Sequence, residues 1–290
     1  MITGAASGLG LEMARRAHAL GMRLVLADVE TAPLARIVDE VRAAGGFALG
    51  EAVDVAVDAQ VARLADRAFG ETGDVGLLVN NAGVGGGGYV WETGEKEWRW
   101  VLGVNVMGVV HGIRHFVPRM LEAEARGIPS HVVNTASIAG WLATPMFGVY
   151  TVSKHAVVAL SETLFHDLRT AGSGIGVSLL CPAFVPTGIA RSERNRPADL
   201  SEAAPETASQ VRARAAVERA VAGGKIGAAD VARMTFEAVR EGRFYVFPHP
   251  QILESVRARH EAALAGGPPA DPYGQRPENR PDAARQDPSD

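Results

Sequence analysis

Apolar and polar residues alternate along this chain in two ways, as short β-branched runs and as longer stretches with helical spacing. The apolar runs lie at residues 23–27, 47–53, 75–80, 131–137, 175–182 and 244–247. The helical stretches lie at residues 9–20, 32–44, 58–72, 95–125, 147–171, 206–221, 228–240 and 251–265, and the fourth is long enough to be two helices. Continuous apolar strands that alternate with helices are typical of a parallel sheet covered on both faces. We therefore predict an α/β fold with a doubly wound parallel sheet and helices on both faces.

The C-terminal part of the chain departs from this pattern. From residue 266 onward the sequence is rich in Pro, Gly, Asp and Arg and has hardly an apolar side chain. Such a segment cannot offset its ordering entropy, so residues 266–290 are predicted to be a disordered tail. Residues 1–265 then form a single domain. Residues 188–224 begin polar and turn helical, and we expect them to form a lid over the substrate.

The N-terminal part carries an anomaly. A glycine-rich run begins at Thr3, which leaves only Met1 and Ile2 for the strand that should precede it. That strand is central in a doubly wound sheet, and each backbone group left facing a gap costs about 1–3 kcal/mol. We expect a truncated first strand and, in a protein that starts at Met1, poor stability. A true start several codons upstream is our hypothesis for the missing residues.

Composition narrows the classes of partner. The 290 residues are 47% apolar and 21% charged, with a net charge of −4 and no basic tract, so no nucleic acid is expected. No stretch approaches the roughly 20 apolar residues of a membrane helix, so no membrane is expected. The single cysteine, Cys181, excludes an intrachain disulfide and fits a reducing compartment, so we predict a cytoplasmic protein.

The glycine-rich run Thr-Gly-Ala-Ala-Ser-Gly-Leu-Gly at residues 3–10 leads into a predicted helix. Gly4, Gly8 and Gly10 allow a tight turn and a close approach of the backbone to a pyrophosphate at the helix N-terminus. The spacing differs from the commonest dinucleotide fingerprint, and by itself it also fits a flexible loop.

The next apolar run ends at an acid, Asp28, which lies 18 residues after Gly10. A ribose-binding carboxylate is expected near this position. A carboxylate accepts a hydrogen bond from a 2′-hydroxyl and repels a 2′-phosphate, by on the order of 1–4 kcal/mol. Ser7 and Val29 beside it are uncharged, so the sequence offers no cation to a phosphate. We predict NAD(H) rather than NADP(H) as the cofactor.

A tyrosine and a lysine, Tyr150 and Lys154, lie four residues apart and so on one face of a predicted helix. A phenol titrates near 10, and an ammonium one turn away favours the phenolate and lowers that pKa. The pair then acts as an acid/base near neutral pH. The same spacing also occurs by chance on exposed amphipathic helices, so the pair needs the support of other signals.

Together these features resemble the short-chain dehydrogenase/reductase superfamily, in its NAD-preferring subgroup, over residues 2–247. The glycine run is similar to that family's cofactor turn. The run Asn-Asn-Ala-Gly at residues 80–83 is similar to its element after the fourth strand. The run at residues 182–187 is similar to its nicotinamide loop, with Ala183 in place of the usual glycine. The positions that match the catalytic tetrad are Asn105, Ser137, Tyr150 and Lys154. The positions that match the cofactor contacts are Gly4, Ser7, Gly8, Leu9, Gly10, Asp28, Asp54, Val55, Asn81, Ala82, Gly83, Tyr150, Lys154, Pro182, Val185 and Thr187.

The resemblance implies a single-domain Rossmann-type fold, a homodimer or homotetramer, and a role for each member of the tetrad. Tyr150 exchanges the substrate proton, and Lys154 lowers its pKa and holds the nicotinamide ribose. Ser137 hydrogen-bonds the substrate oxygen, where charge develops in the transition state. Asn105 fixes a water that links Lys154 to solvent.

The substrate is expected beside residues 139–148, where Trp141, Leu142, Met146 and Phe147 favour an apolar, bulky alcohol or ketone. Three arginines at the start of the lid either bind a carboxylate or a coenzyme A phosphate or are simply solvated. They are Arg191, Arg194 and Arg196.

Other interpretations stay open. His111 and His115 have the spacing of a zinc pair but lack a third ligand, so no metal is predicted. An NADPH-dependent ketoreductase on acyl thioesters is the alternative enzyme, and Asp28 disfavours it. A non-catalytic dinucleotide sensor has no need of the full tetrad. A truncated, inactive product would follow from the short first strand.

Overall fold

The computed structural model describes residues 1–201, 205–274 and 280. Its strands are β1 (Ile2–Thr3), β2 (Leu24–Asp28), β3 (Ala48–Ala52), β4 (Leu77–Asn80), β5 (His131–Thr135), β6 (Gly176–Leu180) and β7 (Tyr245–Val246). Its α-helices are α1 (Gly8–Ala19), α2 (Thr31–Ala43), α3 (Asp58–Thr72), α4 (Glu95–Leu102), α5 (Gly108–Glu124), α6 (Gly148–Thr170), α7 (Ala208–Ala222), α8 (Ala228–Glu241) and α9 (Leu253–Leu264). Each predicted strand and helix is present, and most boundaries agree within one or two residues.

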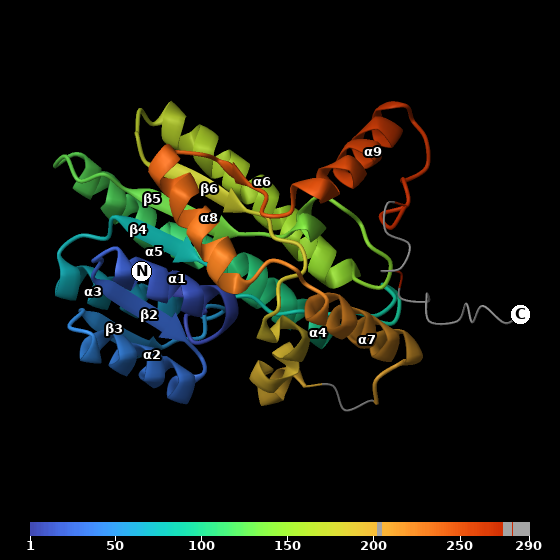
Figure 1. Ribbon diagram of the computed structural model, residues 1–290, viewed down its shortest axis with the longest axis horizontal. Coiled ribbons are helices and arrows are strands. Elements are labelled where there is room, and N and C mark those ends of the chain that lie inside the picture. The colour runs from blue at the N-terminus through green and yellow to red at the C-terminus, as the bar shows by residue number, and fades with distance from the viewer. Residues whose placement is uncertain (202–204, 275–279, 281–290) are drawn as a thin grey trace, which may run out of the picture.

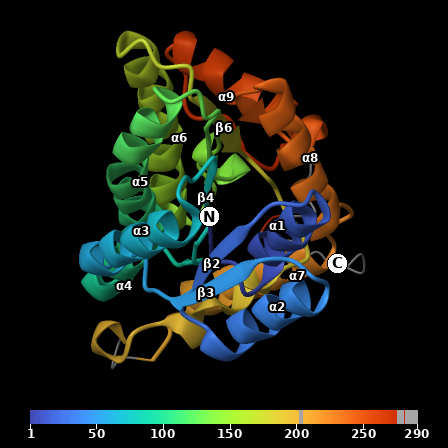
Figure 2. The same cartoon turned by 90° about the vertical axis from the view of Figure 1, so that its left-hand side faces the viewer.

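The described strands form one parallel seven-stranded sheet in the order β3-β2-β1-β4-β5-β6-β7. Helices α1, α2 and α8 cover one face and α3, α5 and α6 cover the other (Figures 1 and 2). Two separate apolar clusters fill the layers, one with Leu26 and Phe236 and one with Leu78 and Phe116. The predicted doubly wound α/β fold is therefore confirmed.

The chain order reverses on either side of β1, which lies between β2 and β4. In open α/β sheets a ligand-binding crevice forms at such a point, outside the carboxyl ends of the strands. The topology therefore places the functional site beside the loops that follow β1 and β4, before any side chain is considered.

The first strand is short, as predicted, but it fills the space between its neighbours instead of leaving a gap. Ile2 pairs with Leu26 of β2 and with Val79 of β4. The Val79 amide donates to the Met1 carbonyl at 2.9 Å, and the Met1 ammonium donates to the Leu77 carbonyl at 2.9 Å. The gap that we expected between β2 and β4 is therefore filled over these residues, and their backbone groups are paired. The expected poor stability stays a prediction.

The long stretch at residues 95–125 forms two helices, as expected, which follow one another without a loop between them. Helices α4 and α5 are joined by a π-helical turn, η1 (Gly103–Met107), which contains the buried Asn105. By length and composition alone, the run Glu95–Glu124 is able to span a membrane, contrary to our reading of the sequence, and half of its most apolar window is buried inside the fold. Phe116 and Met120 within it are fully buried against the sheet layer, as in a core helix.

The predicted tail lies only partly within the described residues. Residues 275–279 and 281–290 lie outside them, so disorder there stays a prediction. The described part from 266 to 274 includes a buried residue, Tyr273, which is 9% exposed. The tail therefore returns to the domain at one point.

The turn between β1 and α1 depends on the absence of side chains at its glycines. Gly4 and Gly8 have φ values of +65° and +54°, in the left-handed region. A Cβ on Gly10 would lie 2.0 Å from the Gly4 carbonyl oxygen and 2.7 Å from the Asn81 side chain. Helix α1 can therefore pack directly against the turn that precedes it.

We predict that Gly10→Ala lowers the free energy of unfolding by about 1–3 kcal/mol, because the added methyl group overpacks this contact. The matched control is Gly70→Ala in α3, where a Cβ meets nothing within 4 Å. That control should raise the free energy by about 0.5–1 kcal/mol through helix propensity. Urea denaturation measures both, and equal effects of the two substitutions would contradict the prediction.

Candidate active site

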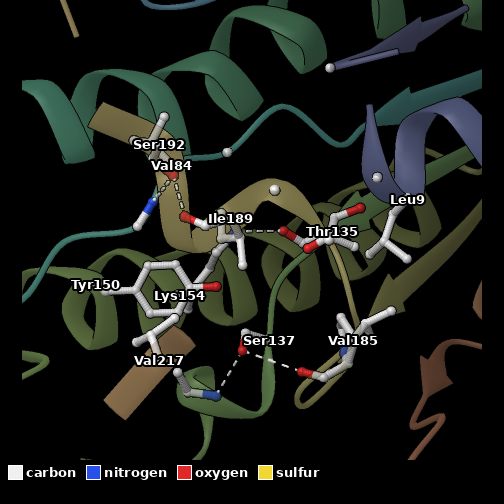
Figure 3. Close-up of a pocket in the computed structure, with 18 of the residues that line it drawn as sticks. Leu9, Val84, Thr135, Ser137, Tyr150, Lys154, Val185, Ile189, Ser192 and Val217 are labelled. Carbon is white, nitrogen blue, oxygen red and sulfur yellow. Dashed lines mark hydrogen bonds between the residues drawn. The ribbon is translucent and has the colours of Figure 1, made fainter. Parts of the chain in front are cut away.

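A single cavity of about 340 Å³ lies along the carboxyl ends of the strands, from the glycine turn to Tyr150. Almost all positions predicted from the sequence to bind a cofactor or act in catalysis line it. They are Gly4, Ser7, Gly8, Leu9, Asp28, Asp54, Val55, Asn81, Ala82, Gly83, Ser137, Tyr150, Lys154, Pro182, Val185 and Thr187. Gly10 and Asn105 do not line it. Each instead contacts the backbone of a loop that does, Gly10 at the glycine turn and Asn105 at Val84. Figure 3 shows Ser137, Tyr150 and Lys154 with Ile189 and Ser192 around the cavity.

The floor of the glycine turn is tied to the loop after β4. The Thr3 hydroxyl accepts hydrogen bonds from the Asn81 and Ala82 amides at 2.9 and 3.1 Å. The Asn81 side chain donates to the Thr3 carbonyl at 3.1 Å. A Cβ on Gly4 would lie 2.8 Å from the Ala82 backbone. The two loops on either side of the switch point therefore form one rigid cradle.

Asp28, at the end of β2, is buried and holds both of its carboxylate oxygens in fixed positions. One oxygen accepts from the Ala6 amide at 2.9 Å and the other from the Glu30 amide at 3.0 Å. Burial raises the pKa of this carboxyl, while these backbone hydrogen bonds act in the opposite direction. The carboxylate is thus built into the cradle, and its bond to the Glu30 amide also closes the turn that follows β2.

Asp54 and Val55 line the neighbouring wall after β3. The Asp54 carboxylate accepts from the Ala56 amide at 2.9 Å, which closes a tight turn. His111 Nδ1 lies 2.8 Å from the Val55 carbonyl, so α5 supports this wall from outside. His115 contacts Asp58 at 2.8 Å. No group of three or more His, Cys, Asp or Glu able to hold a metal is found in the described parts of the chain.

Lys154 is the central buried charge of the site. Its ammonium donates to the Thr135 carbonyl at 3.0 Å and lies 5.7 Å from the centre of the Tyr150 ring. Burial lowers the pKa of Lys154 to about 8. A Cβ on Gly83 would lie 3.6 Å from this nitrogen, so the glycine leaves space beside it.

The structure corrects the expected pKa of Tyr150. Burial raises this pKa above its usual value, and a hydrogen bond with Ser137 only partly opposes the shift. Removal from water therefore favours the neutral phenol in this state, and the expected lowering of the Tyr150 pKa is not observed. The two side chains still share one face of α6 and one cavity, as predicted.

Ser137 joins the ends of β5 and β6. Its hydroxyl donates to the Pro182 carbonyl at 3.3 Å and accepts from the Ala139 amide at 3.1 Å. These bonds fix the hydroxyl at the start of the loop that carries Pro182, Val185 and Thr187 to the cavity. Ala183, which stands where the nicotinamide loop usually has a glycine, fits this backbone, and its amide donates to His249 Nδ1 at 3.2 Å.

Asn105 contacts the backbone behind the cavity rather than the cavity itself. Its Oδ1 accepts from the Val84 amide at 2.8 Å and its Nδ2 donates to the Val84 carbonyl at 3.0 Å. Nδ2 also lies 3.0 Å from the Ser153 hydroxyl. The π-helical turn thereby locks the loop after β4 to helix α6, close to Lys154.

The segment predicted to be a lid borders the cavity with its 3₁₀ helix η3 (Gly188–Asn195) and with α7. Ser192 accepts from the Gly85 amide at 2.9 Å, which ties the lid to the run of glycines after β4. The described part of this segment therefore lies over the site, while residues 202–204 fall outside the described residues.

Two of the three arginines at the start of the lid, Arg194 and Arg196, are paired, while Arg191 is exposed. Arg196 is buried against Glu97 and Glu193 and lies 4.1 Å from the Trp100 ring. Arg194 pairs with Glu30 at 2.7 Å, two residues from Asp28. The sequence-based statement that no cation lies near this end of the cavity is therefore wrong, although Glu30 neutralises that cation.

Cys181 is a packed side chain. Burial raises the pKa of its thiol to about 12, and the Trp141 indole donates to its sulfur at 3.3 Å. A buried thiol that keeps its proton acts in packing rather than as a nucleophile.

Sequence reasoning missed several contributors to the cavity, among them the Thr135 carbonyl, Arg194 in its pairing with Glu30, and Tyr273 from the tail. A backbone carbonyl carries no signal in the residue type. Arg194 and Tyr273 are distant in sequence from the residues they meet, although Tyr273 is the single aromatic residue after position 265.

The residues present fit a dinucleotide. A glycine cradle, a fixed carboxylate at the end of β2 and a cavity that continues to Lys154 and Tyr150 correspond to a pyrophosphate, an adenosine ribose and a nicotinamide in turn. The arrangement can therefore place the phenol of Tyr150, which is able to exchange a proton, beside such a ligand.

Comparison with known proteins agrees with this geometry. A family model described as short chain dehydrogenase matches residues 1–198. The chain is 36% identical to a 1-deoxy-11-beta-hydroxypentalenate dehydrogenase of Streptomyces exfoliatus, over 89% of this chain and 85% of that protein. It is 30% identical to a C alpha-dehydrogenase of Sphingobium sp., over 95% of this chain and 88% of that protein. Among solved structures, a short chain dehydrogenase/reductase from Burkholderia phymatum in complex with NAD is 55% identical, with a TM-score of 0.91, over 93% of this chain and 95% of that one.

The lowered pKa of Lys154 predicts a pH-dependent stability. Its ordinary pKa of 10.5 falls to about 8 on burial. Between these values the unfolded chain holds a proton that the folded protein releases, so the free energy of unfolding rises with pH. From about pH 7.5 to pH 9.5 the wild type should gain about 2 kcal/mol relative to Lys154→Met. Urea denaturation at both pH values measures this, and parallel behaviour of the two proteins would contradict it.

Proposed function

The chain belongs to the short-chain dehydrogenase family, and on that premise we propose that it transfers a hydride between NAD(H) and an apolar secondary alcohol or ketone. The observation that carries this proposal is the convergence of Tyr150, Lys154 and Ser137 on the cavity that begins at the glycine turn. Proton exchange and dinucleotide binding are thus brought together in one continuous space.

In this proposal Tyr150 takes the proton of the alcohol in oxidation and returns it in reduction. The Ser137 oxygen is held by the Ala139 amide, and its single proton, which the Pro182 carbonyl accepts in this state, turns to the substrate oxygen as negative charge develops there. Lys154 holds a ribose hydroxyl and supplies the positive charge that a phenolate at Tyr150 needs. The nicotinamide, when bound, accepts or gives the hydride. Asn105 acts through the backbone at Val84 and keeps the loop after β4 beside Lys154.

The preference for NAD(H) rests on Asp28. Its fixed carboxylate accepts from a 2′-hydroxyl and repels a 2′-phosphate, and burial strengthens that repulsion because the local dielectric is low. The nearby Arg194 does not cancel the repulsion of a 2′-phosphate, since its positive charge is neutralised by the ion pair with Glu30. The complex of the Burkholderia phymatum protein with NAD supports the same preference.

The substrate class follows from the charges that line the cavity. Among the described residues, these are Asp28, Glu30, Asp54, Lys154 and Arg194. All but Lys154 lie at the dinucleotide end, near the ends of β2 and β3. The other end is bordered by apolar side chains, which are Leu142, Phe147, Phe184, Val217, Val221 and Ile252. A neutral, bulky alcohol or ketone suits this end better than a carboxylate or a phosphate-bearing thioester.

We infer a cytoplasmic homodimer or homotetramer for the whole enzyme. A single buried thiol is compatible with a reducing compartment, and the assembly follows from the family resemblance. Light scattering on the purified protein measures the number of subunits.

The acid/base assignment predicts that Tyr150→Phe lowers kcat by orders of magnitude while NADH binding stays nearly intact, because the ring is kept and only the exchangeable proton is lost. Steady-state kinetics and an NADH titration measure the two quantities. Near-normal turnover in the variant would remove Tyr150 from the mechanism.

The cofactor and reaction assignments predict that NADH raises the melting temperature of the wild type more than NADPH does at equal concentration. In the same preparation, NAD and a panel of secondary alcohols should give an absorbance increase at 340 nm, largest for bulky apolar alcohols. A larger shift with NADPH would favour the acyl-thioester ketoreductase. Binding without turnover across the panel would favour the sensor.

A further inference from the structure

The lid is attached to the dinucleotide end of the cavity by one pair of charged side chains. Arg194 Nη2 lies 2.7 Å from Glu30 Oε2, and its Nε lies 3.1 Å from Glu30 Oε1. This two-point geometry is the strongest form of arginine–carboxylate contact. The two residues are 164 positions apart in the sequence. The contact therefore joins the loop after β2 to a segment that enters the fold much later.

The same guanidinium also organises the lid segment itself. Arg194 Nη1 donates to the Gly188 carbonyl at 3.2 Å and to the Arg191 carbonyl at 2.8 Å. Four of the five donors of the group are thus in use. Asn195 adds a contact to Glu30 at 3.4 Å. Arg194 therefore holds the backbone of η3 in shape and fixes that shape to Glu30.

The segment held in this way borders the cavity. Gly188, Ile189, Ser192, Arg194 and Asn195 of η3 all line it. At its start, Thr187 packs on the glycine turn, where a Cβ on Gly8 would lie 3.2 Å from the Thr187 side chain. At its end lies Glu30, beside Asp28. The segment therefore spans the cavity from the expected pyrophosphate position to the expected ribose position.

We propose that Glu30 and Arg194 form a clamp that holds residues 188–195 over the bound dinucleotide and slows its release. The proposal rests on the proposed function only in requiring that a dinucleotide occupies this end of the cavity. Both residues are positioning residues, since they act on the lid backbone rather than on the reacting atoms. The site takes the adenosine and pyrophosphate half of a nicotinamide dinucleotide.

The rival explanation is that the two charges act separately, by attracting or repelling a negatively charged cofactor. The two explanations predict opposite changes in cofactor affinity when the Glu30 charge is removed. Removing the Glu30 charge should strengthen cofactor binding if charge alone matters, whereas removing the Arg194 charge should weaken it. A clamp requires both partners, so loss of either one should weaken binding.

The experiment compares wild type, Glu30→Gln, Arg194→Met, the double variant and the control Arg191→Met. Arg191 is exposed, lies in the same segment and does not line the cavity, so its substitution removes the same charge without the clamp. NADH release is followed by stopped-flow fluorescence. Each single variant should release NADH about threefold to tenfold faster, the double variant should not exceed the larger single effect by more than about twofold, and the control should match wild type.

Amide hydrogen exchange of residues 188–196 in the cofactor-free protein gives a second measurement that does not depend on NADH. Exchange should be faster in both single variants and unchanged in Arg191→Met. Opposite effects of the two substitutions on NADH release, or wild-type exchange and release in both, would overturn the clamp. Failure of the wild type to bind NADH would instead contradict the proposed function, while hydrogen exchange would still report whether the pair holds the lid.

Discussion

The site depends on one buried positive charge, the ammonium of Lys154. It donates to the Thr135 carbonyl, and burial lowers its pKa to about 8. A charge in such a position is costly unless hydrogen-bond acceptors and counter-charges surround it. Helix α6 places the ammonium on the same face as Tyr150, and β5 supplies the acceptor. The π-helical turn with Asn105 holds the loop that leaves space at Gly83. Several elements from distant parts of the chain thus converge on a single group.

The topology of the sheet brings this group next to the cofactor cradle. Strands β1 and β4 are neighbours at the point where the strand order reverses, and the loops after them are joined through Thr3 and Asn81. The cavity that begins there ends at Tyr150. The lid then borders the cavity from the open side, tied through Ser192 to Gly85 and through Arg194 to Glu30. The catalytic end and the dinucleotide end are therefore parts of one rigid frame with one attached lid.

Local patterns in the sequence were sufficient for much of the fold and the site. The period of the apolar residues located each helix and strand, and α3 agrees at both ends with its predicted range. The glycine turn, Asp28 and the pair Tyr150 and Lys154 are recognisable because each depends on residue types at a fixed local spacing. For β1, the sequence predicted only that the strand is short. That its two residues pair on both sides could not be predicted, because their partners lie in β2 and β4.

Features that depend on tertiary contacts could not be predicted in the same way. The pairing of Arg194 with Glu30 joins residues whose separation no spacing rule covers. The direction of the pKa shift at Tyr150 depends on burial, which the spacing of Tyr150 and Lys154 in the sequence does not reveal. The contribution of Tyr273 depends on how a segment of tail-like composition returns to the domain. In each case, the deciding quantity is a distance or a burial that exists only in the folded protein.

The most direct test of the central claim follows the hydride itself. The protein is incubated with NAD and an apolar secondary alcohol that carries deuterium on its carbinol carbon, and the NADH is analysed by mass spectrometry. Direct transfer within one cavity predicts that the NADH carries the deuterium quantitatively and that the rate falls with a primary isotope effect. Loss of the deuterium to water, or NADH formed without the label, would contradict the account.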